Sequence, residues 1–206
     1  AIFYELLMGV QFFESIEQSN QLKEYIYDYY INPEMLQHKK EYEQAIDLFT
    51  KALRLSLGDL AETHLYRGIC YAYLSAYDKA MSDFNDALRR NPYIADVYNE
   101  RGNLYRLVGN FQLAIEDYNA TIAIDDTHYA AYYNRALTFE KIGELASAEA
   151  DLTRAIALKS DILNCYEARA RIRTELKHYQ GAIADYERFL ELGGGLEYDN
   201  QSDVQS

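Results

Sequence analysis

The stretch that decides the fold is residues 98–118, YNERGNLYRLVGNFQLAIEDY, in which apolar residues follow helical spacing on both sides of a central glycine. Its puzzling residue is Gly102, because a glycine inside a helix costs about 1 kcal/mol relative to alanine. Gly109, in contrast, stands between the two helical halves, where a left-handed turn residue is expected. The stretch therefore predicts two helices joined by a short turn, with a small residue required somewhere along the first helix.

The same pattern recurs along the chain. The copies that align with the opening stretch are residues 64–84, 132–152 and 166–186. One alanine column marks the register, and its members are spaced 34 positions apart: Ala80, Ala114, Ala148 and Ala182. Ala45 lies 35 residues before Ala80, which implies one extra residue in the turn between them. A fixed period of this size indicates a solenoid of stacked two-helix units.

Aligning the copies explains Gly102, because its column contains only small residues: Gly68, Gly102, Ala136 and Ala170. We expect the two helices of each unit to cross closely there, with the register alanines on the other side of the contact. Two neighbouring columns are mostly aromatic: His64, Tyr98, Tyr132 and Tyr166, and Tyr71, Tyr105 and Phe139. Many of the 21 tyrosines are therefore expected in the core, with hydroxyls that reach its edge.

The combined pattern resembles the tetratricopeptide repeat, a helix–turn–helix unit with a large residue, a small residue, an aromatic, an alanine and a second aromatic at fixed positions. The resemblance implies an all-α fold, a right-handed superhelical solenoid of antiparallel helix pairs with about five repeats. The units that match well are 61–94, 95–128, 129–162 and 163–196. A degenerate first repeat, 26–59, matches only in its second half, YEQAIDLFTKALRLS.

The two ends of the chain depart from the repeat. Pro33 occupies the small-residue column of the first repeat, so we expect Asn32 to cap a short helix that Pro33 opens. Residues 1–31 are predicted to form a separate N-terminal helical segment that packs on the stack. The polar tail, residues 197–206, is predicted to be disordered, which leaves the C-terminal end of the stack without a polar capping helix.

Comparing the repeats with one another also predicts charge pairs. Each complete repeat has an arginine and, sixteen residues later, an aspartate: Arg67 and Asp83, Arg101 and Asp117, Arg135 and Asp151, Arg169 and Asp185. The first repeat has Asn32 and Leu48 at these places and lacks both charges. We interpret the pairs as structural ion pairs that join the helices of one repeat or of adjacent repeats. The alternative is a basic ladder that binds a ligand.

Composition excludes several classes of function. The net charge of −13 argues against nucleic acid and anionic membranes as partners. The four histidines are scattered, and neither Cys70 nor Cys165 has a neighbouring histidine at a useful spacing, so no metal, cofactor or catalytic group is expected. We therefore predict that the protein is not an enzyme. The two cysteines form no disulfide framework and suit a reducing compartment, which favours a cytoplasmic location.

The resemblance implies that the first helices of the repeats line a concave groove. The residues expected to bind a peptide there are Tyr66, Tyr73, Asn99, Asn103, Tyr133, Asn134 and Asn164. Amide side chains both donate and accept, so they pair with peptide N–H and C=O groups, and tyrosines are frequent anchors at interfaces. Some relatives hold a chaperone's C-terminal carboxylate with lysines and an arginine, and those basic residues are absent here. A chaperone C-terminal tail is therefore not expected as a partner.

The sequence thus predicts a non-enzymatic scaffold that binds a protein or peptide segment, more readily a neutral or basic one. Two alternatives remain open at this point: a structural or self-association module, and a regulatory domain of a larger protein. The oligomeric state and the identity of the partner are not fixed by the sequence.

Overall fold

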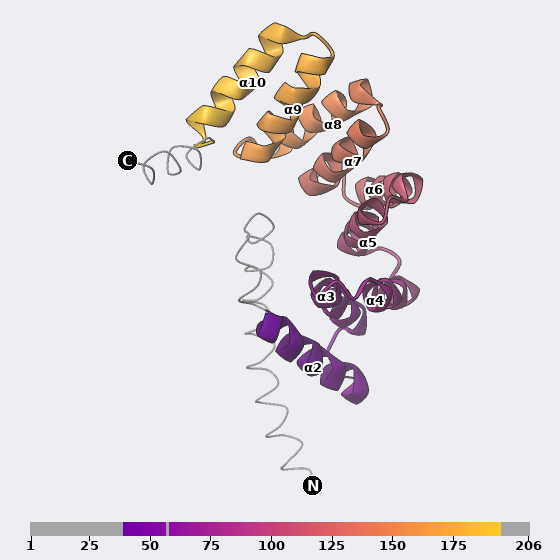
Figure 1. Cartoon of the computed structure of the whole chain (residues 1–206). Coiled ribbons are helices and arrows are strands. Elements are labelled where there is room, and N and C mark those ends of the chain that lie inside the picture. The colour runs from indigo at the N-terminus through magenta and orange to yellow at the C-terminus, as the bar shows by residue number, and fades with distance from the viewer. Residues whose placement is uncertain (1–38, 57, 195–206) are drawn as a thin grey trace, which may run out of the picture. The chain divides into compact units, whose positions relative to one another are not determined.

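The computed structural model describes residues 39–56 and 58–194, and all regular secondary structure in this part of the chain is helical (Figure 1). The chain divides into two compact units, residues 1–91 and 92–206. The predictions for residues 1–31, for the first half of the repeat at 26–59 and for the tail at 197–206 fall outside the described residues.

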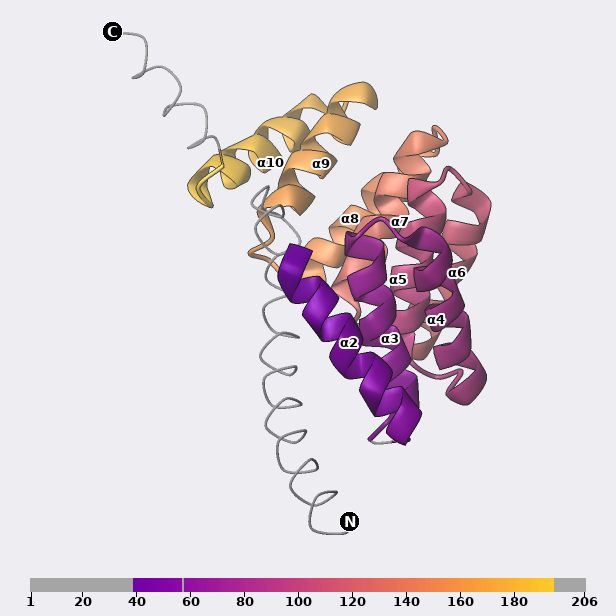
Figure 2. The ribbon, with the colours of Figure 1, turned by 60° about the horizontal axis from the view of Figure 1, so that its bottom comes forward.

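Apart from the first described helix, the helices of both units come in pairs joined by short turns. The first unit contains α2 (Lys39–Leu55), α3 (Leu60–Tyr73) and α4 (Tyr77–Arg90). The second contains α5 (Ala95–Leu107), α6 (Phe111–Ile124), α7 (Tyr129–Lys141), α8 (Leu145–Leu158), α9 (Leu163–Glu175) and α10 (Tyr179–Glu191). Each first helix packs on the second helix of its own repeat, and α6 packs on α7 as α8 packs on α9 (Figure 2).

The turn inside each repeat has one residue in the left-handed conformation. Its φ is +58° at Ser75, +83° at Gly109, +82° at Gly143 and +63° at Lys177, positions that recur with the repeat period. The next residue then donates its N–H back across the end of the first helix, as Asn110 does to the carbonyl of Tyr105 at 2.8 Å. Glycine adopts this conformation without steric cost, which explains why two of the four turns have a glycine at this position.

Gly102 is small because the ring of Tyr118 lies against it. A Cβ added to Gly102 would stand 2.8 Å from Cε1 of Tyr118, and one added to Gly68 would stand 2.7 Å from the ring of Phe84. The prediction of a close helix crossing is thus explained mainly by the aromatic side chain sixteen residues later. The register alanine contributes its backbone, since the carbonyl oxygen of Ala80 would be 3.3 Å from a Cβ on Gly68.

The residues of the aromatic columns are buried or partly buried, and two of their hydroxyls find partners at the edge of the core. Tyr132 and Tyr166 are both buried and donate to the carbonyls of Asp126 and Ser160, at 3.3 and 3.0 Å, in the turn before their own helix. Satisfying the hydroxyl in this way lets a tyrosine fill a core position. None of the described helices is long and apolar enough to cross a membrane.

Candidate functional site

Each complete repeat contains a two-pronged arginine–aspartate pair between its helices. Nε and Nη2 of Arg135 donate to the two carboxylate oxygens of Asp151, both at 2.7 Å. The other pairs, with distances from 2.6 to 2.9 Å, are Arg67 with Asp83, Arg101 with Asp117 and Arg169 with Asp185. All four aspartates are buried, so this geometry supplies the charge-assisted bonds that a buried carboxylate needs.

The same arginines also reach the preceding repeat. Nη1 of Arg135 donates to the side chain of Asn119 on α6 at 2.5 Å, and Nη1 of Arg169 donates to Thr153 on α8 at 3.1 Å. In the first unit, Arg67 makes the corresponding bond to Thr50 on α2 at 3.0 Å. One guanidinium therefore joins the two helices of its own repeat and ties that repeat to its neighbour.

Aromatic rings hold these guanidinium groups in place. The Cζ of Arg101 lies 5.5 Å from the ring centre of Tyr98 and 5.9 Å from that of Tyr105. Arg135 has the same relation to Tyr132 and Phe139. The hydrogen bond to Asp117 raises the pKa of Arg101 above its usual value. These groups are fully engaged inside the protein, so the arrangement favours the structural interpretation over a basic ladder that binds a ligand.

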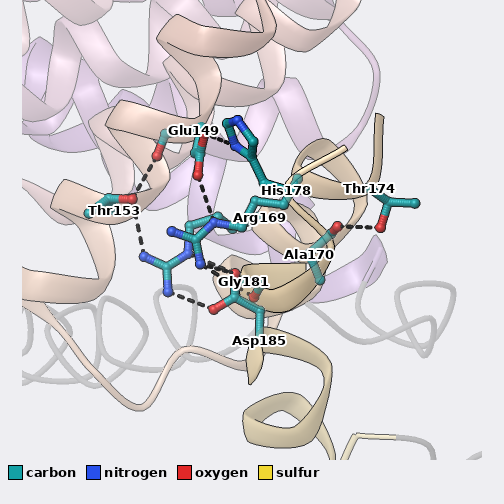
Figure 3. Close-up of polar contacts among 9 residues, drawn as sticks. Glu149, Thr153, Arg169, Ala170, Thr174, His178, Gly181 and Asp185 are labelled. Atoms are coloured by element: carbon teal, nitrogen blue, oxygen red, sulfur yellow. Dashed lines mark hydrogen bonds and ion pairs between the residues drawn. The ribbon is translucent and has the colours of Figure 1, made fainter. Parts of the chain in front are cut away.

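The last repeat contains a second ion pair that the sequence comparison missed. Arg173 donates from Nε to Glu149 at 2.7 Å and from Nη1 to Asp185 at 2.9 Å. Figure 3 shows Glu149, Arg169, His178 and Asp185 converging where α8, α9 and α10 meet, with His178 Nδ1 3.2 Å from Glu149. A signal was present: Arg173 occupies an otherwise aromatic column and Glu149 an otherwise apolar one.

The inner face of the second unit is formed by α5, α7 and α9, which lie next to one another. Asn99 and Asn134, on α5 and α7, are only 5% and 8% exposed. Asn134 donates to the side-chain oxygen of Asn99 at 3.2 Å, and Asn99 donates to Glu100 at 3.0 Å. Both amides are therefore used largely to join neighbouring first helices. Asn103 is more exposed, accepts from the hydroxyl of Tyr118 at 2.9 Å and donates to Glu100 at 3.3 Å.

Beyond the asparagines, the same face holds a group of charged residues and one tyrosine. Arg171 donates twice to the carboxylate of Glu140, at 2.8 and 3.0 Å, which joins α9 to α7. Burial raises the pKa of Tyr133 to about 12, while the charges of Arg106 and Arg171 act in the opposite direction. Within the described part of the chain, the buried Nε of Arg106 has no hydrogen-bond partner. A buried donor of this kind usually has an acceptor.

The remaining predicted binding residues occupy other positions. Tyr66 and Tyr73, in the first unit, stack on Phe49 and Tyr42 of α2, with ring centres 6.3 and 4.9 Å apart. Their rings therefore contribute to packing between α2 and α3. Asn164 lies in the first turn of α9 and is partly exposed.

The described residues give little support for a metal or a nucleophile. His64, Asp83 and Asp86 are the one group among them close enough to share a metal ion. However, Asp83 already accepts from Arg67 and lies 2.8 Å from the imidazole of His64. Burial raises the pKa of each thiol, Cys70 and Cys165, to about 12, so both stay protonated and unreactive near neutral pH.

Family models identify the repeats directly. Models of the tetratricopeptide repeat match residues 39–95, 95–128 and 129–162, which together make up more than half of the 206 residues. The chain belongs to the tetratricopeptide repeat family. It is an all-α tetratricopeptide repeat solenoid, a class of protein-interaction scaffold.

Individual relatives agree with this assignment. Residues of this chain are 35% identical over 60 positions to heat shock protein STI1 of Saccharomyces cerevisiae, a match that spans 29% of this chain and 10% of that protein. The crystal structure of MamA superposes with a TM-score of 0.66 and 20% identity, covering 79% of this chain and 95% of MamA. The first repeat domain of Spaghetti (RPAP3), bound to the HSP90 peptide SRMEEVD, gives a TM-score of 0.55 and 21% identity, covering 57% and 93%. Structural likeness at these identities establishes the fold alone.

Proposed function

We propose that the scaffold binds an extended segment of a partner protein on the α5–α7–α9 face, defined here as Asn103, Arg106, Tyr133, Glu140 and Arg171. The observation that carries the proposal is the buried Nε of Arg106, which lacks an acceptor within the described residues. An oxygen of a bound segment would supply that acceptor once the Arg106 side chain turns toward the segment. Asn103 lies one helical turn before Arg106, and its amide would pair with the backbone of the same segment.

The charges of this face favour a neutral or basic segment over an acidic one. At the inward-facing positions of the three helices, five acidic residues outnumber three basic ones: Asp96, Glu100, Glu140, Glu167 and Glu175 against Arg106, Lys141 and Arg171. Arg171 is already neutralised by Glu140. A segment that offers a backbone carbonyl to Arg106 and a neutral or basic side chain to Glu100 and Glu167 would therefore fit better than an acidic one.

The same charges disfavour an ionised C-terminal tail such as the HSP90 peptide held by Spaghetti (RPAP3). The positions that correspond to that binding mode are Asn99, Asn103, Asn134, Asn164 and Ala168, and the two lysines and the arginine expected among them are absent. Arg106 alone would have to offset the carboxylates of the tail beside Glu100. The likeness to STI1 supports protein partners in general and covers too little of that protein to specify one.

The test is to compare variants of the inner face with a matched surface variant. Arg106→Leu and Tyr133→Ala are expected to lose at least about tenfold in affinity for segments selected from a peptide library, which corresponds to about 1.4 kcal/mol. Arg154→Leu, at an exposed position of α8, should leave binding unchanged. Circular dichroism and melting temperature would verify that all variants fold. Unchanged binding by both inner-face variants would refute the proposed site.

A further inference from the structure

The outer surface of α10 carries an exposed apolar stripe. Its four side chains are Tyr179, Ile183, Tyr186 and Leu190, with exposures of 58%, 57%, 41% and 60%. The intervals between them are four, three and four residues, so they share one face of the helix.

Earlier repeats of the same unit show what such a face does. The Tyr186 column contains Tyr118 on α6 and Leu152 on α8, and both are 0% exposed. They are covered because α7 packs on α6 and α9 packs on α8. In the described part of the chain no helix follows α10, so the equivalent stripe stays open there. The stripe is therefore a packing face of the repeat without its usual neighbour.

The residues that follow α10 in the sequence do not have the apolar pattern of the first helix of a next repeat. In repeat register, Asp199, Ser202 and Ser206 take the columns of Cys165, Ala168 and Ile172. Those three residues of α9 belong to the core cluster formed with α8. A next helix built in this register would place a carboxylate and two hydroxyls against the stripe, at a cost in desolvation.

We propose that the stripe binds a second copy of this chain, with the two α10 helices packed antiparallel about a two-fold axis. Apolar residues that recur at alternating intervals of four and three positions form the seam between paired helices. The ends of α10 also differ in net charge: Lys177 precedes the helix, whereas Glu187 and Glu191 outnumber Arg188, which donates to Glu191, toward its end. An antiparallel pair brings these opposite charges together, whereas a parallel pair would place Glu187 beside the same residue of the other copy.

The two-fold axis fixes which residues meet. It passes between Ile183 and Tyr186, so that Ile183 of each copy faces Tyr186 of the other, and Tyr179 faces Leu190. Tyrosines at the ends of the seam keep their hydroxyls at the solvent edge. A single helix pair is small beside the interfaces of permanent dimers, so the association should depend on protein concentration.

The first test is sedimentation velocity of the whole chain over a wide range of concentrations. The wild type is expected to shift from monomer to dimer, Ile183→Glu to remain monomeric, and Leu107→Glu, which changes an equally exposed residue on α5, to behave as wild type. A dimer that survives Ile183→Glu would overturn the proposal. A wild type that stays monomeric at every concentration would also overturn the proposal. If Ile183→Glu then lowered the melting temperature of that monomer, another segment of the same chain would be the one that covers the stripe.

The second test addresses the antiparallel arrangement. Ile183→Glu and Tyr186→Lys should each be monomeric alone, yet a mixture of the two should recover dimer. The carboxylate introduced at position 183 of one variant would face the ammonium group introduced at position 186 of the other, and the second contact would remain native. A parallel pair would bring no such contact, so failure of the mixture would exclude the arrangement. This outcome is independent of peptide binding on the α5–α7–α9 face.

Discussion

The repeats formed by α7/α8 and α9/α10 hold their helices together in different ways. In the first, Arg135 binds Asp151 and lies between the rings of Tyr132 and Phe139. In the second, the position of Phe139 is taken by Arg173, so that Asp185 receives two arginines. The same backbone thus accommodates either an aromatic ring or a second guanidinium beside the common ion pair.

The difference teaches that a polar residue in an apolar column requires a change elsewhere. Arg173 is only 20% exposed, and it is matched by Glu149, which stands where α6 has Ile115. Replacing buried ion pairs by well-packed apolar residues is often neutral or stabilising, whereas removing one partner is costly. The charged junction, meaning the contact of Glu149 with Arg173 between α8 and α9, therefore depends on both residues being present. It is not expected to stabilise the protein more than the apolar contact at the same columns of the interior repeat.

The largest effect is expected from removing the aspartate of the interior repeat. Asp151→Ala leaves the guanidinium of Arg135 among aromatic rings with only Asn119 as a partner, and should lower the free energy of unfolding by about 3–5 kcal/mol. Asp185→Ala should cost less globally, because Arg173 keeps Glu149 and Arg169 keeps Thr153. Urea unfolding followed by circular dichroism would measure both.

Hydrogen exchange would separate local from global effects of these two variants. Asp185→Ala is expected to speed exchange mainly in α9 and α10, because an end repeat has fewer neighbours to hold it. Asp126→Ala, in an exposed turn, is the control and should be near neutral. An unfolding midpoint lowered equally by Asp151→Ala and Asp185→Ala would contradict the distinction drawn between the two repeats.

The fold could be predicted best where the repeats agree with one another. The periodic columns predicted the all-α repeat fold and placed each arginine sixteen residues before its aspartate, which is where the structure brings the two together. This worked because a helix pair of constant geometry turns a constant spacing into a constant contact. The coupled exchange at Glu149 and Arg173 was missed because each residue departs from a different column.

The inner face was harder to predict. Asn99 and Asn134 were expected to face a bound peptide, yet they are buried and bonded to each other. Helical periodicity tells which side of α5 a residue occupies, but it does not tell how closely α5 and α7 approach one another. The unsatisfied nitrogen of Arg106 could not be read from the sequence at all, because it depends on the positions of atoms from several helices.

A medium effect is expected from converting the charged junction into the apolar kind. The double variant Glu149→Ile/Arg173→Tyr restores the residue types of the other repeats and should be within about 1 kcal/mol of wild type, or more stable. Each single variant should cost more than the double, which gives a coupling energy of at least about 1 kcal/mol. Additive single effects in a double-mutant cycle would show that the two columns are independent.

The smallest effect is expected in the acid dependence of the same junction. Burial would raise the pKa of Glu149, but the hydrogen bond and charge of Arg173 outweigh it and hold the pKa below its usual value of about 4.3. Stability from this group is present above that value and is lost as the pH falls through the lower pKa of the folded state.

Glu149→Gln should therefore lose less stability than wild type between about pH 5.5 and pH 3.5, by under about 1 kcal/mol, because solvent screens a partly exposed pair. Urea midpoints at low salt would measure the difference, with Glu116→Gln at an exposed position of α6 as the control. The contact between α6 and α7 has Ile115 in the column of Glu149, so its stability cannot depend on pH in the same way. If wild type and Glu149→Gln lost stability equally on acidification, the pair of Glu149 with Arg173 would contribute no net stability, and the two junctions would differ in side-chain shape alone.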